Sequence, residues 1–447
     1  MQDTMLILRN QENIMSNKLA VIARIAKQDK NVRFTSLMHL LNKENLAICF
    51  KMLAKNAATG IDEVTIKTYG KNLDANLEGL ISRLKGKWYK PKPVRRVYIP
   101  KPGKKESRPL GIPSIEDKVV QMALKWVLQA IYEQDFLDCS YGFRPGRSCH
   151  TAIKQLNVSV MKHPVNYIVE VDIRKFFDMV DHVKLLELLQ LRIADPNILW
   201  LIRKFLKAGI MDAGAWQASE NGVPQGGVVS PILANIYLHY VLDVWFESRF
   251  QTQSKGYMRL IRYCDDFVAL CESKYDADRF IDELEARLAE FNLEISRGKT
   301  RSIKFGRQAW KQAQRDGTKV ATFDFLGFTH YCGKSSKGWF VMGHKTSKRS
   351  LNAKLKSNNS WLRSIRNMVS LKELWPIIKA KLIGHYNYFG INGNIRCLAQ
   401  YLNCMKLMVF KWINRRSQKK SMNWKQFQKY LDWNPLPTPR VYHAILY

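Results

Sequence analysis

Acidic residues are scarce in this chain: 38 Asp and Glu residues face 72 Lys and Arg residues, which leaves a formal net charge of +34 at pH 7. A positive excess of this size indicates a polyanionic partner, and nucleic acid is the first candidate. An anionic membrane surface is the competing explanation, but no apolar run approaches the length of a membrane span. Residues 1–4 also lack the basic and then apolar pattern of a secretory signal. We therefore expect a nucleic-acid partner and no membrane partner.

Paired cysteines are missing as well. None of the eight cysteines stands in a Cys-x-x-Cys pair, which argues against a zinc site and against a disulfide framework. A cytoplasmic location, where cysteines stay reduced, is the simplest expectation. No sequence period of 20–50 residues and no low-complexity tract is present, so a repeat architecture is not expected. With 447 residues, 46% of them apolar, the chain is long enough for a sizeable globular core.

The positive charge is concentrated late in the sequence. From residue 331 onward, 22 Lys and Arg residues face two acidic residues, Glu373 and Asp432, for a net charge of +20. Apolar residues recur there at helical spacing, as in Leu371, Leu374 and Ile378. The pattern predicts a basic helical bundle from about residue 331.

Upstream of residue 331, the sequence predicts a mixture of helices and strands. We expect residues 13–90 to be mostly helical and the Pro- and Gly-rich stretch 91–113 to form a hairpin with a basic tip. Ser114 is placed to cap a long amphipathic helix that ends near Tyr132. The remaining predicted elements are a strand at 165–171, helices at 183–190, 231–248 and 276–290, and strands at 293–295 and 323–328.

Two adjacent aspartates, Asp265 and Asp266, stand between two apolar segments, a pattern that predicts a hairpin with both carboxylates at its tip. Adjacent like charges cost energy unless a cation neutralises them, and a divalent metal is the simplest partner. An isolated pair would more simply be a surface turn, but a third carboxylate, Asp172, ends another apolar strand. Three carboxylates suffice for two Mg²⁺ ions, which keep water and phosphate ligands as well. For Asp178 and Asp181, a turn and a helix cap are the simpler explanations.

The ordered motifs resemble those of a known enzyme family. The strand that ends at Asp172, the segment Pro224-Gln225-Gly226 and the segment Tyr263-Cys264-Asp265-Asp266 are similar, in this order, to motifs A, B and C of reverse transcriptases. Where the family commonly has alanine before the Asp pair, this chain has Cys264. Longer blocks resemble group II intron-encoded reverse transcriptase/maturases, and they are Arg108-Pro109-Leu110-Gly111-Ile112-Pro113, Ser140-Tyr141-Gly142-Phe143-Arg144-Pro145-Gly146-Arg147-Ser148, Ser230-Pro231-Ile232-Leu233-Ala234-Asn235 and Phe325-Leu326-Gly327-Phe328.

This resemblance implies an α+β fold, the right-hand polymerase, with helical fingers, an antiparallel-sheet palm and a basic helical thumb. It divides the chain into an N-terminal helical extension (1–34), reverse transcriptase fingers and palm (35–330), and an RNA-binding thumb or maturase domain (331–447).

The resemblance also implies roles in catalysis. Asp172, Asp265 and Asp266 would bind two Mg²⁺ ions together with the backbone carbonyl of Ile173. Lys299 would protonate the leaving pyrophosphate, although on charge alone it would count as an ordinary surface lysine.

A second set of residues would bind the incoming nucleotide. By resemblance, Lys101 and Arg108 would clamp its triphosphate, and a guanidinium suits phosphate because it can donate two parallel hydrogen bonds. Phe177 would be the steric gate that excludes a ribose 2′-hydroxyl, and Gln225 would contact the nucleotide. Gly226 would let the backbone approach the substrate, since it has no side chain.

The basic bundle combines arginines with tryptophans, a mixture suited to RNA phosphates and unstacked bases. We expect four arginines to contact RNA: Arg363, Arg366, Arg415 and Arg416.

The function implied by the resemblance is RNA-dependent DNA synthesis from dNTPs on an RNA template with a DNA primer or target, together with binding of intron RNA and assistance in its splicing and mobility. Many relatives carry an HNH endonuclease domain with paired cysteines; because this sequence has none, we expect the form without that domain, which would use a pre-existing 3′ end as primer. A homodimer is left open. Two alternatives remain, an intron-free relative that acts in DNA repair or phage defence and an RNA-binding splicing factor without polymerase activity.

Overall fold

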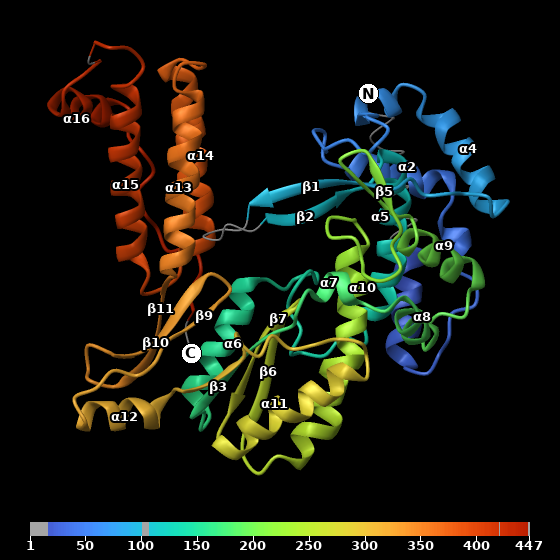
Figure 1. Ribbon diagram of the computed structural model, residues 1–447, viewed down its shortest axis with the longest axis horizontal. Coiled ribbons are helices and arrows are strands. Elements are labelled where there is room, and N and C mark those ends of the chain that lie inside the picture. Colours follow the sequence, from blue (N-terminus) through green and yellow to red (C-terminus); the bar gives the residue numbers. More distant parts are fainter. Residues whose placement is uncertain (1–16, 101–106, 420, 446–447) are drawn as a thin grey trace.

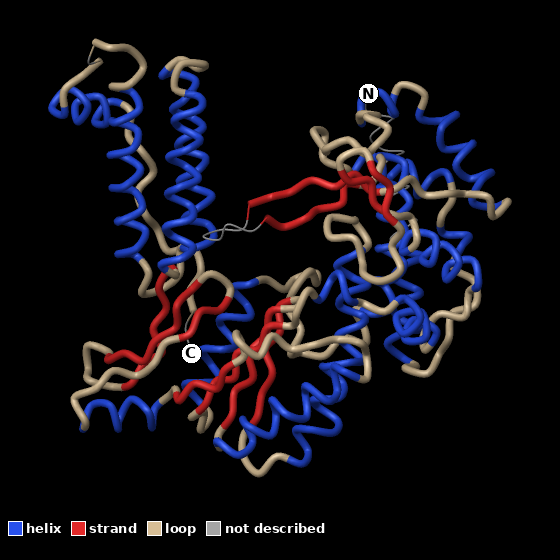
Figure 2. The backbone as a smooth tube through the Cα atoms, in the orientation of Figure 1, coloured by secondary structure: helices blue, strands red, loops and turns tan. Residues whose placement is uncertain are grey.

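The computed structural model describes residues 17–100, 107–419 and 421–445. Helices of the N-terminal part lie at one side of the molecule, a central sheet lies beside them, and the C-terminal helices stand apart as a bundle (Figure 1 and Figure 2). Strands β1 (Val94–Pro100) and β2 (Ser107–Ile112) project from the N-terminal helices toward this bundle. Helices and mainly antiparallel sheets are combined, so the fold is α+β.

The N-terminal part is mostly helical, as predicted. Its longest helix, α5 (Ile115–Tyr132), begins where the Ser114 hydroxyl accepts a hydrogen bond from the backbone N–H of Asp117 at 3.1 Å, which confirms the predicted cap. The inward side chains of α5, such as Leu124 and Leu128, are fully buried. The helical segments before it are residues 17–28, a 3-10 turn at Met38–Leu40, α2 (Lys43–Met52), α3 (Ile66–Gly70) and α4 (Leu73–Lys85).

The projecting hairpin belongs to a four-stranded sheet with the order β2-β1-β4-β5, which includes β4 (Ile210–Asp212) and β5 (Ala215–Gln217). Strands β1 and β2 pair antiparallel along their whole length, whereas β4 runs parallel to β1. The hairpin predicted within residues 91–113 is therefore confirmed. Its predicted basic tip, residues 101–106, lies outside the described residues.

The central sheet has the order β6-β7-β3-β8, with every neighbouring pair antiparallel. Its strands are β3 (Tyr167–Asp172), β6 (Met258–Tyr263), β7 (Asp266–Cys271) and β8 (Arg301–Lys304). Successive residues of β3 enter different hydrophobic clusters: Ile168 packs with α6 (Cys149–Lys162), and Val169 packs with α11 (Lys274–Ala289). Both faces are therefore covered, which explains the continuous apolar runs in these strands.

The helices between β3 and β6 are α7 (Phe176–Met179), α8 (His182–Gln190), α9 (Pro196–Leu206) and α10 (Ser230–Leu238). Helix α10 continues through π-helical turns at His239–Asp243 and Phe246–Phe250 into a 3-10 turn at Gln251–Gln253. Helices α8 and α10 lie close to the helices predicted at 183–190 and 231–248, whereas α7 and α9 were not predicted. Asp181 caps α8, as expected. The strand predicted at 293–295 is wrong. Asn292 has a φ of 55°, which interrupts extended backbone, and Ile295 forms only a single bridge, with Ile173.

A third sheet leads from the central sheet to the C-terminal helices. It has the antiparallel order β11-β10-β9, from β9 (Phe323–Phe325), β10 (Phe328–Lys334) and β11 (Phe340–Thr346), and α12 (Arg307–Arg315) packs beside β10. The strand predicted at 323–328 is broken in two, because Leu326 and Gly327 form a turn with φ values of 49° and 79°. The domain boundary expected between residues 330 and 331 lies within β10.

The C-terminal helices α13 (Lys348–Ile365), α14 (Leu371–Phe389), α15 (Ile395–Ile413) and α16 (Trp424–Trp433) share one hydrophobic core. The predicted bundle is present, but it begins at α13 because β10 and β11 precede it. The segment after α16 folds back along the bundle, where the N–H of Tyr442 donates to the carbonyl oxygen of Gly390 at 2.7 Å. Among the described helices, none has the length and apolar character needed to cross a membrane.

Candidate active site

Three aspartates meet at one end of the central sheet. Asp172 is the last residue of β3 and pairs directly with Asp266, the first residue of β7. Strands β6 and β7 are joined by the two-residue loop Cys264–Asp265, because Tyr263 pairs with Asp266. The structure thus brings together the three carboxylates that the sequence singled out, across nearly a hundred residues of chain; their role as metal ligands remains a prediction.

The carboxyl groups influence one another. Desolvation, followed by the charges of Asp265 and Asp172, raises the pKa of Asp266 to about 7. Asp266 is nevertheless exposed at the surface, and both neighbouring carboxylates act on it. Burial likewise raises the pKa of Asp265, against hydrogen bonds from its own backbone and Cys264 and the positive charge of Arg108. A cation placed here would relieve a repulsion that is already present.

A lysine occupies part of this acidic cluster. Lys299 Nζ donates a hydrogen bond to Asp172 Oδ2, and the two side chains are 54% and 45% exposed. Within the described residues, no three His, Cys, Asp or Glu side chains form a ready-made metal cage. Mg²⁺ does not require one, because it keeps several waters and substrate phosphates among its ligands. The predicted position of Lys299 beside the acids is therefore observed, whereas its proton transfer is untested.

The backbone around Ile173 is hydrogen-bonded to the irregular segment at residues 294–296, which follows α11. The N–H of Ser296 donates to the carbonyl oxygen of Asp172 at 2.7 Å, and the N–H of Arg174 donates to the carbonyl oxygen of Glu294 at 2.8 Å. The Ile173 side chain is buried. These bonds fix the backbone on both sides of Ile173, and the role of its carbonyl oxygen as a metal ligand stays a prediction.

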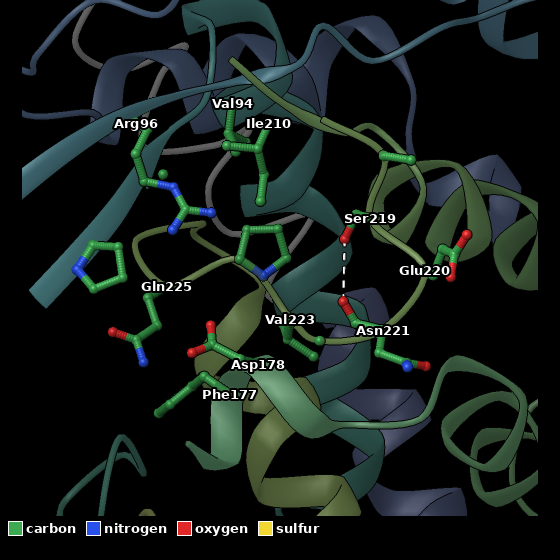
Figure 3. Close-up of a pocket in the computed structure, with 15 residues that line it drawn as sticks. Val94, Arg96, Phe177, Asp178, Ile210, Ser219, Glu220, Asn221, Val223 and Gln225 are labelled. Carbon is green, nitrogen blue, oxygen red and sulfur yellow. Dashed lines mark hydrogen bonds between the residues drawn. The ribbon is translucent and has the colours of Figure 1, made fainter. Parts of the chain in front are cut away.

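A pocket of about 470 Å³ lies between the projecting hairpin and α7. Phe177 and Gln225 both line it (Figure 3). The preceding aromatic residue, Phe176, is instead buried and packs edge-on against the Phe177 ring at 5.3 Å. Phe176 thus belongs to the core, whereas Phe177 lines the pocket, and its role as the steric gate stays a prediction.

The loop that carries Gln225 is fastened to β2. The N–H of Gly111 donates to the carbonyl oxygen of Gln225 at 2.6 Å. Gly226 has a φ of 105°, and an added Cβ would lie 2.7 Å from the carbonyl oxygen of Gly111. The structure shows that Gly226 lets the backbone approach β2; its predicted approach to a substrate stays a prediction.

Of the two predicted triphosphate ligands, Lys101 lies outside the described residues. Arg108 is exposed on β2, and its charge is felt by Asp265. The sequence reasoning missed Arg96, which points from β1 into the pocket toward the side where Phe177 and Asp178 lie (Figure 3). Its Nε atom is buried and has no hydrogen-bond partner among the described residues. In the sequence, the only sign that Arg96 belongs to the site is its position in the predicted hairpin, close to the basic tip.

A second, open hollow of about 610 Å³ adjoins the acids on the side of the third sheet and includes Asp172, Asp266, Lys299 and Leu326 in its lining. A hydrogen bond from the Leu326 backbone partly offsets the rise in the pKa of Asp266, which desolvation dominates. The Phe325–Phe328 block thus reaches the acidic cluster through the turn between β9 and β10.

The four predicted RNA-binding arginines form one group at the end of the bundle far from the central sheet, where α13 and α15 end. Arg366 donates from Nε to the carbonyl oxygen of Arg415 at 3.2 Å and from Nη1 to that of Arg363 at 2.7 Å. The guanidinium groups of Arg366 and Arg415 lie 5.3 and 5.7 Å from the ring centre of Trp412. Arg416 directly follows Arg415.

Comparison with known proteins adds independent information. A family model described as "Reverse transcriptase (RNA-dependent DNA polymerase)" matches residues 99–330. Group II intron-encoded protein LtrA from Lactococcus lactis subsp. cremoris is 40% identical over 229 residues, which make up 50% of this chain and 38% of LtrA. Protein YkfC from Escherichia coli (strain K12) is 35% identical over 289 residues, 58% of this chain and 76% of YkfC.

An uncharacterized 91 kDa protein in a cob intron of Schizosaccharomyces pombe is 37% identical over 238 residues, 52% of this chain and 29% of that protein. The chain therefore matches well under half the length of two of these three relatives.

Proposed function

Because this chain belongs to the reverse transcriptase family, in the group that includes proteins encoded by group II introns, we propose that it is an RNA-dependent DNA polymerase that extends a DNA primer on an RNA template. It would also bind an intron RNA and assist its splicing and mobility. The observation that carries the proposal is the pairing of Asp172 with Asp266 beside Asp265.

The arrangement of the elements supports a right-hand polymerase. The N-terminal helices and the β1–β2 hairpin would serve as fingers, the central sheet as palm and helices α13–α16 as thumb. In this arrangement the acids lie on the palm, the pocket of Phe177 and Gln225 lies toward the fingers, and the Leu326 turn lies toward the thumb.

Asp172, Asp265 and Asp266, with the carbonyl oxygen of Ile173, are the groups that would hold divalent cations. The fit rests on the donor set, because Asp172 pairs with Asp266 on adjacent strands and Asp265 directly precedes Asp266, so carboxylate oxygens of the kind that Mg²⁺ prefers lie together. Two Mg²⁺ ions bound there would lower the barrier by stabilising the negative charge of the reacting phosphate and of the attacking oxygen.

The side chains around the acids would bind and orient the substrates. Arg108 would hold the triphosphate, and Phe177 would close the space that a ribose 2′-hydroxyl needs. The primer 3′-hydroxyl would lose its proton to water as its oxygen attacks the α-phosphorus in line; the bond from the α-phosphorus to the bridging oxygen of the β-phosphate breaks, and pyrophosphate leaves with added negative charge. Lys299, which already bonds to Asp172, is close enough to the acids to give a proton to that leaving group.

The test is primer extension on a poly(rA) template with an oligo(dT) primer, with and without Mg²⁺. Asp265→Asn should abolish extension while RNA affinity stays unchanged, because the amide keeps the shape of the side chain but removes its charge. Asp282→Asn, which changes an exposed aspartate on α11, is the matched control and should extend normally. No Mg²⁺-dependent extension by the unmodified protein would refute the polymerase assignment, whereas extension by Asp265→Asn at the unmodified rate would refute the role of Asp265 in it.

A further inference from the structure

The loop between β6 and β7 has a strained backbone. Cys264 has a φ of 60°, a left-handed conformation, whereas Asp265 is not among the residues with positive φ. Two-residue hairpin loops with this pattern normally place Gly at the first position, since a side chain there is disfavoured. Cys264 is also buried. Surrounding contacts must therefore hold the loop in this conformation.

A fully buried arginine supplies one of these contacts. Arg262 is 0% exposed, and its Nη1 donates to the carbonyl oxygen of Cys264 at 3.0 Å and to Asn235 Oδ1 at 3.0 Å. Its Nε donates to Asp243 Oδ1 at 2.6 Å, and its Nη2 donates to Asp243 Oδ2 and to Ser140 Oγ. Asp243 neutralises the positive charge of Arg262, and the planar guanidinium also bonds to the backbone of the strained loop.

The second contact comes from the segment that contains Gly142. Asn235 Nδ2 donates to the carbonyl oxygen of Gly142 at 2.7 Å. A Cβ on Gly142 would lie 2.6 Å from the backbone nitrogen of Cys264, so this glycine permits direct backbone contact with the loop. The sequence blocks around Gly142 and Asn235 thus converge on the same loop, although neither touches the pocket of Phe177.

We propose that Arg262, Asn235 and Gly142 form a bracket that fixes the Cys264–Asp265 loop and thereby positions the carboxylates of Asp265 and Asp266. These are positioning residues: Arg262 bonds to the carbonyl oxygen of Cys264, Gly142 lies against the Cys264 backbone, and Asn235 bonds to both Arg262 and Gly142. The inference rests on the proposed function, because the position of the carboxylates matters through the chemistry assigned to them. Asp243 accepts from Nε and Nη2 of Arg262, which neutralises the charge, and Nη1 is left to bond both Asn235 and the loop carbonyl of Cys264.

Arg262→Lys is the direct test. Lysine keeps a positive charge opposite Asp243 but lacks the fork that reaches Cys264 and Asn235 together. We expect kcat for primer extension to fall on the order of ten- to hundredfold, because small displacements of reacting groups have effects of this size. The KM for dNTP should stay close to that of the unmodified protein, and the Mg²⁺ concentration at half-maximal activity should rise several-fold.

Asn235→Ala provides a second route in case Arg262→Lys does not fold. Its matched control is Asn358→Ala, which removes another buried amide, bonded to Tyr401 in the C-terminal bundle. Both variants should lose comparable thermal stability. Only Asn235→Ala should change the Mg²⁺ dependence and accelerate amide hydrogen exchange at residues 263–267.

Hydrogen exchange and Mn²⁺ binding followed by electron paramagnetic resonance require no enzymatic turnover. An unmodified protein that does not extend primers would therefore remove the proposed function and leave the bracket testable. Wild-type exchange at 263–267 and wild-type Mn²⁺ affinity in both folded bracket variants would overturn the bracket. The same effects in Asn358→Ala would also overturn it, because general destabilisation would then explain them.

Discussion

Replacing Lys299 by methionine separates two roles that the structure allows for this residue. In the first role, Lys299 competes with metal ions, because its ammonium group bonds to Asp172. In the second, it donates a proton to pyrophosphate. Lys299→Met removes both the charge and the proton but keeps a long apolar side chain, so the two roles give opposite changes in different parameters.

The size of the first effect follows from exposure. The Lys299 and Asp172 side chains are 54% and 45% exposed. An ion pair with this much exposure to solvent has an interaction free energy of about 0.2–1 kcal/mol. Its removal should lower the Mg²⁺ concentration at half-maximal activity by about 1.4- to 5-fold. Loss of a general acid should lower the rate at saturating Mg²⁺ by roughly 10²- to 10⁴-fold.

Single-nucleotide extension measured across a Mg²⁺ titration reports both parameters. Lys304→Met, on β8, is the control, because Lys304 bonds to Gln312 at 2.7 Å instead of to an acid of the site. A Lys299→Met rate within twofold of the unmodified protein at saturating Mg²⁺ would eliminate the proton-donor role. An unchanged half-maximal Mg²⁺ concentration would eliminate the competition.

Three further predictions concern other parts of the chain. Phe177→Ala should admit ribonucleotides and raise the ratio of rNTP to dNTP incorporation; an unaltered ratio in single-nucleotide assays would remove the gate role. Changing Arg415 and Arg416 to Gln should reduce the slope of log affinity for RNA against log salt by about 1.4–1.8, since each phosphate contact contributes about 0.7–0.9; an unaltered slope would place the RNA elsewhere. Burial lowers the pKa of His239 and of His385 to about 4, so protonation favours the unfolded chain. Stability from these two histidines should be complete above pH 6.5 and decline as pH falls toward 4, by roughly 2 kcal/mol each at pH 5. Urea unfolding at pH 8 and pH 5 measures the loss, and a His385→Gln variant that loses as much as the unmodified protein would contradict the assignment.

Local patterns were sufficient for much of the fold. The strand that ends at Asp172, the hairpin of Asp265 and Asp266, and the helix caps Ser114 and Asp181 all depend on residues within a few positions of one another. Periodicity and capping chemistry act over that range, so the sequence could reveal them. The meeting of Asp172 with the hairpin is different, because it followed from the family's motif order and from the cost of unneutralised acids.

Contacts between distant residues were not predictable in the same way. Arg262 stands in an apolar strand, and a single sequence offers no sign that Asp243 and Ser140 neutralise and bond it in the core. Strand β11 and most of β10 in the third sheet were also missed. On β11, Gly343 carries no side chain because the Tyr331 ring lies across it, 2.2 Å from where a Cβ would be. In a single sequence a glycine at this position indicates a turn, because nothing there shows that Tyr331 pairs with it on the neighbouring strand.

The hydrogen bond from the Gly111 N–H to the Gln225 carbonyl oxygen ties the hairpin to the loop that lines the pocket of Phe177. Arg108 and Gly111 share strand β2, so a triphosphate held by Arg108, the role we propose for it, would be coupled through this strand to the Gln225 loop. Binding of the phosphates and the fit of the sugar against Phe177 would then depend on each other. A nucleotide analogue with a shortened phosphate tail would accordingly be discriminated less strictly at its ribose.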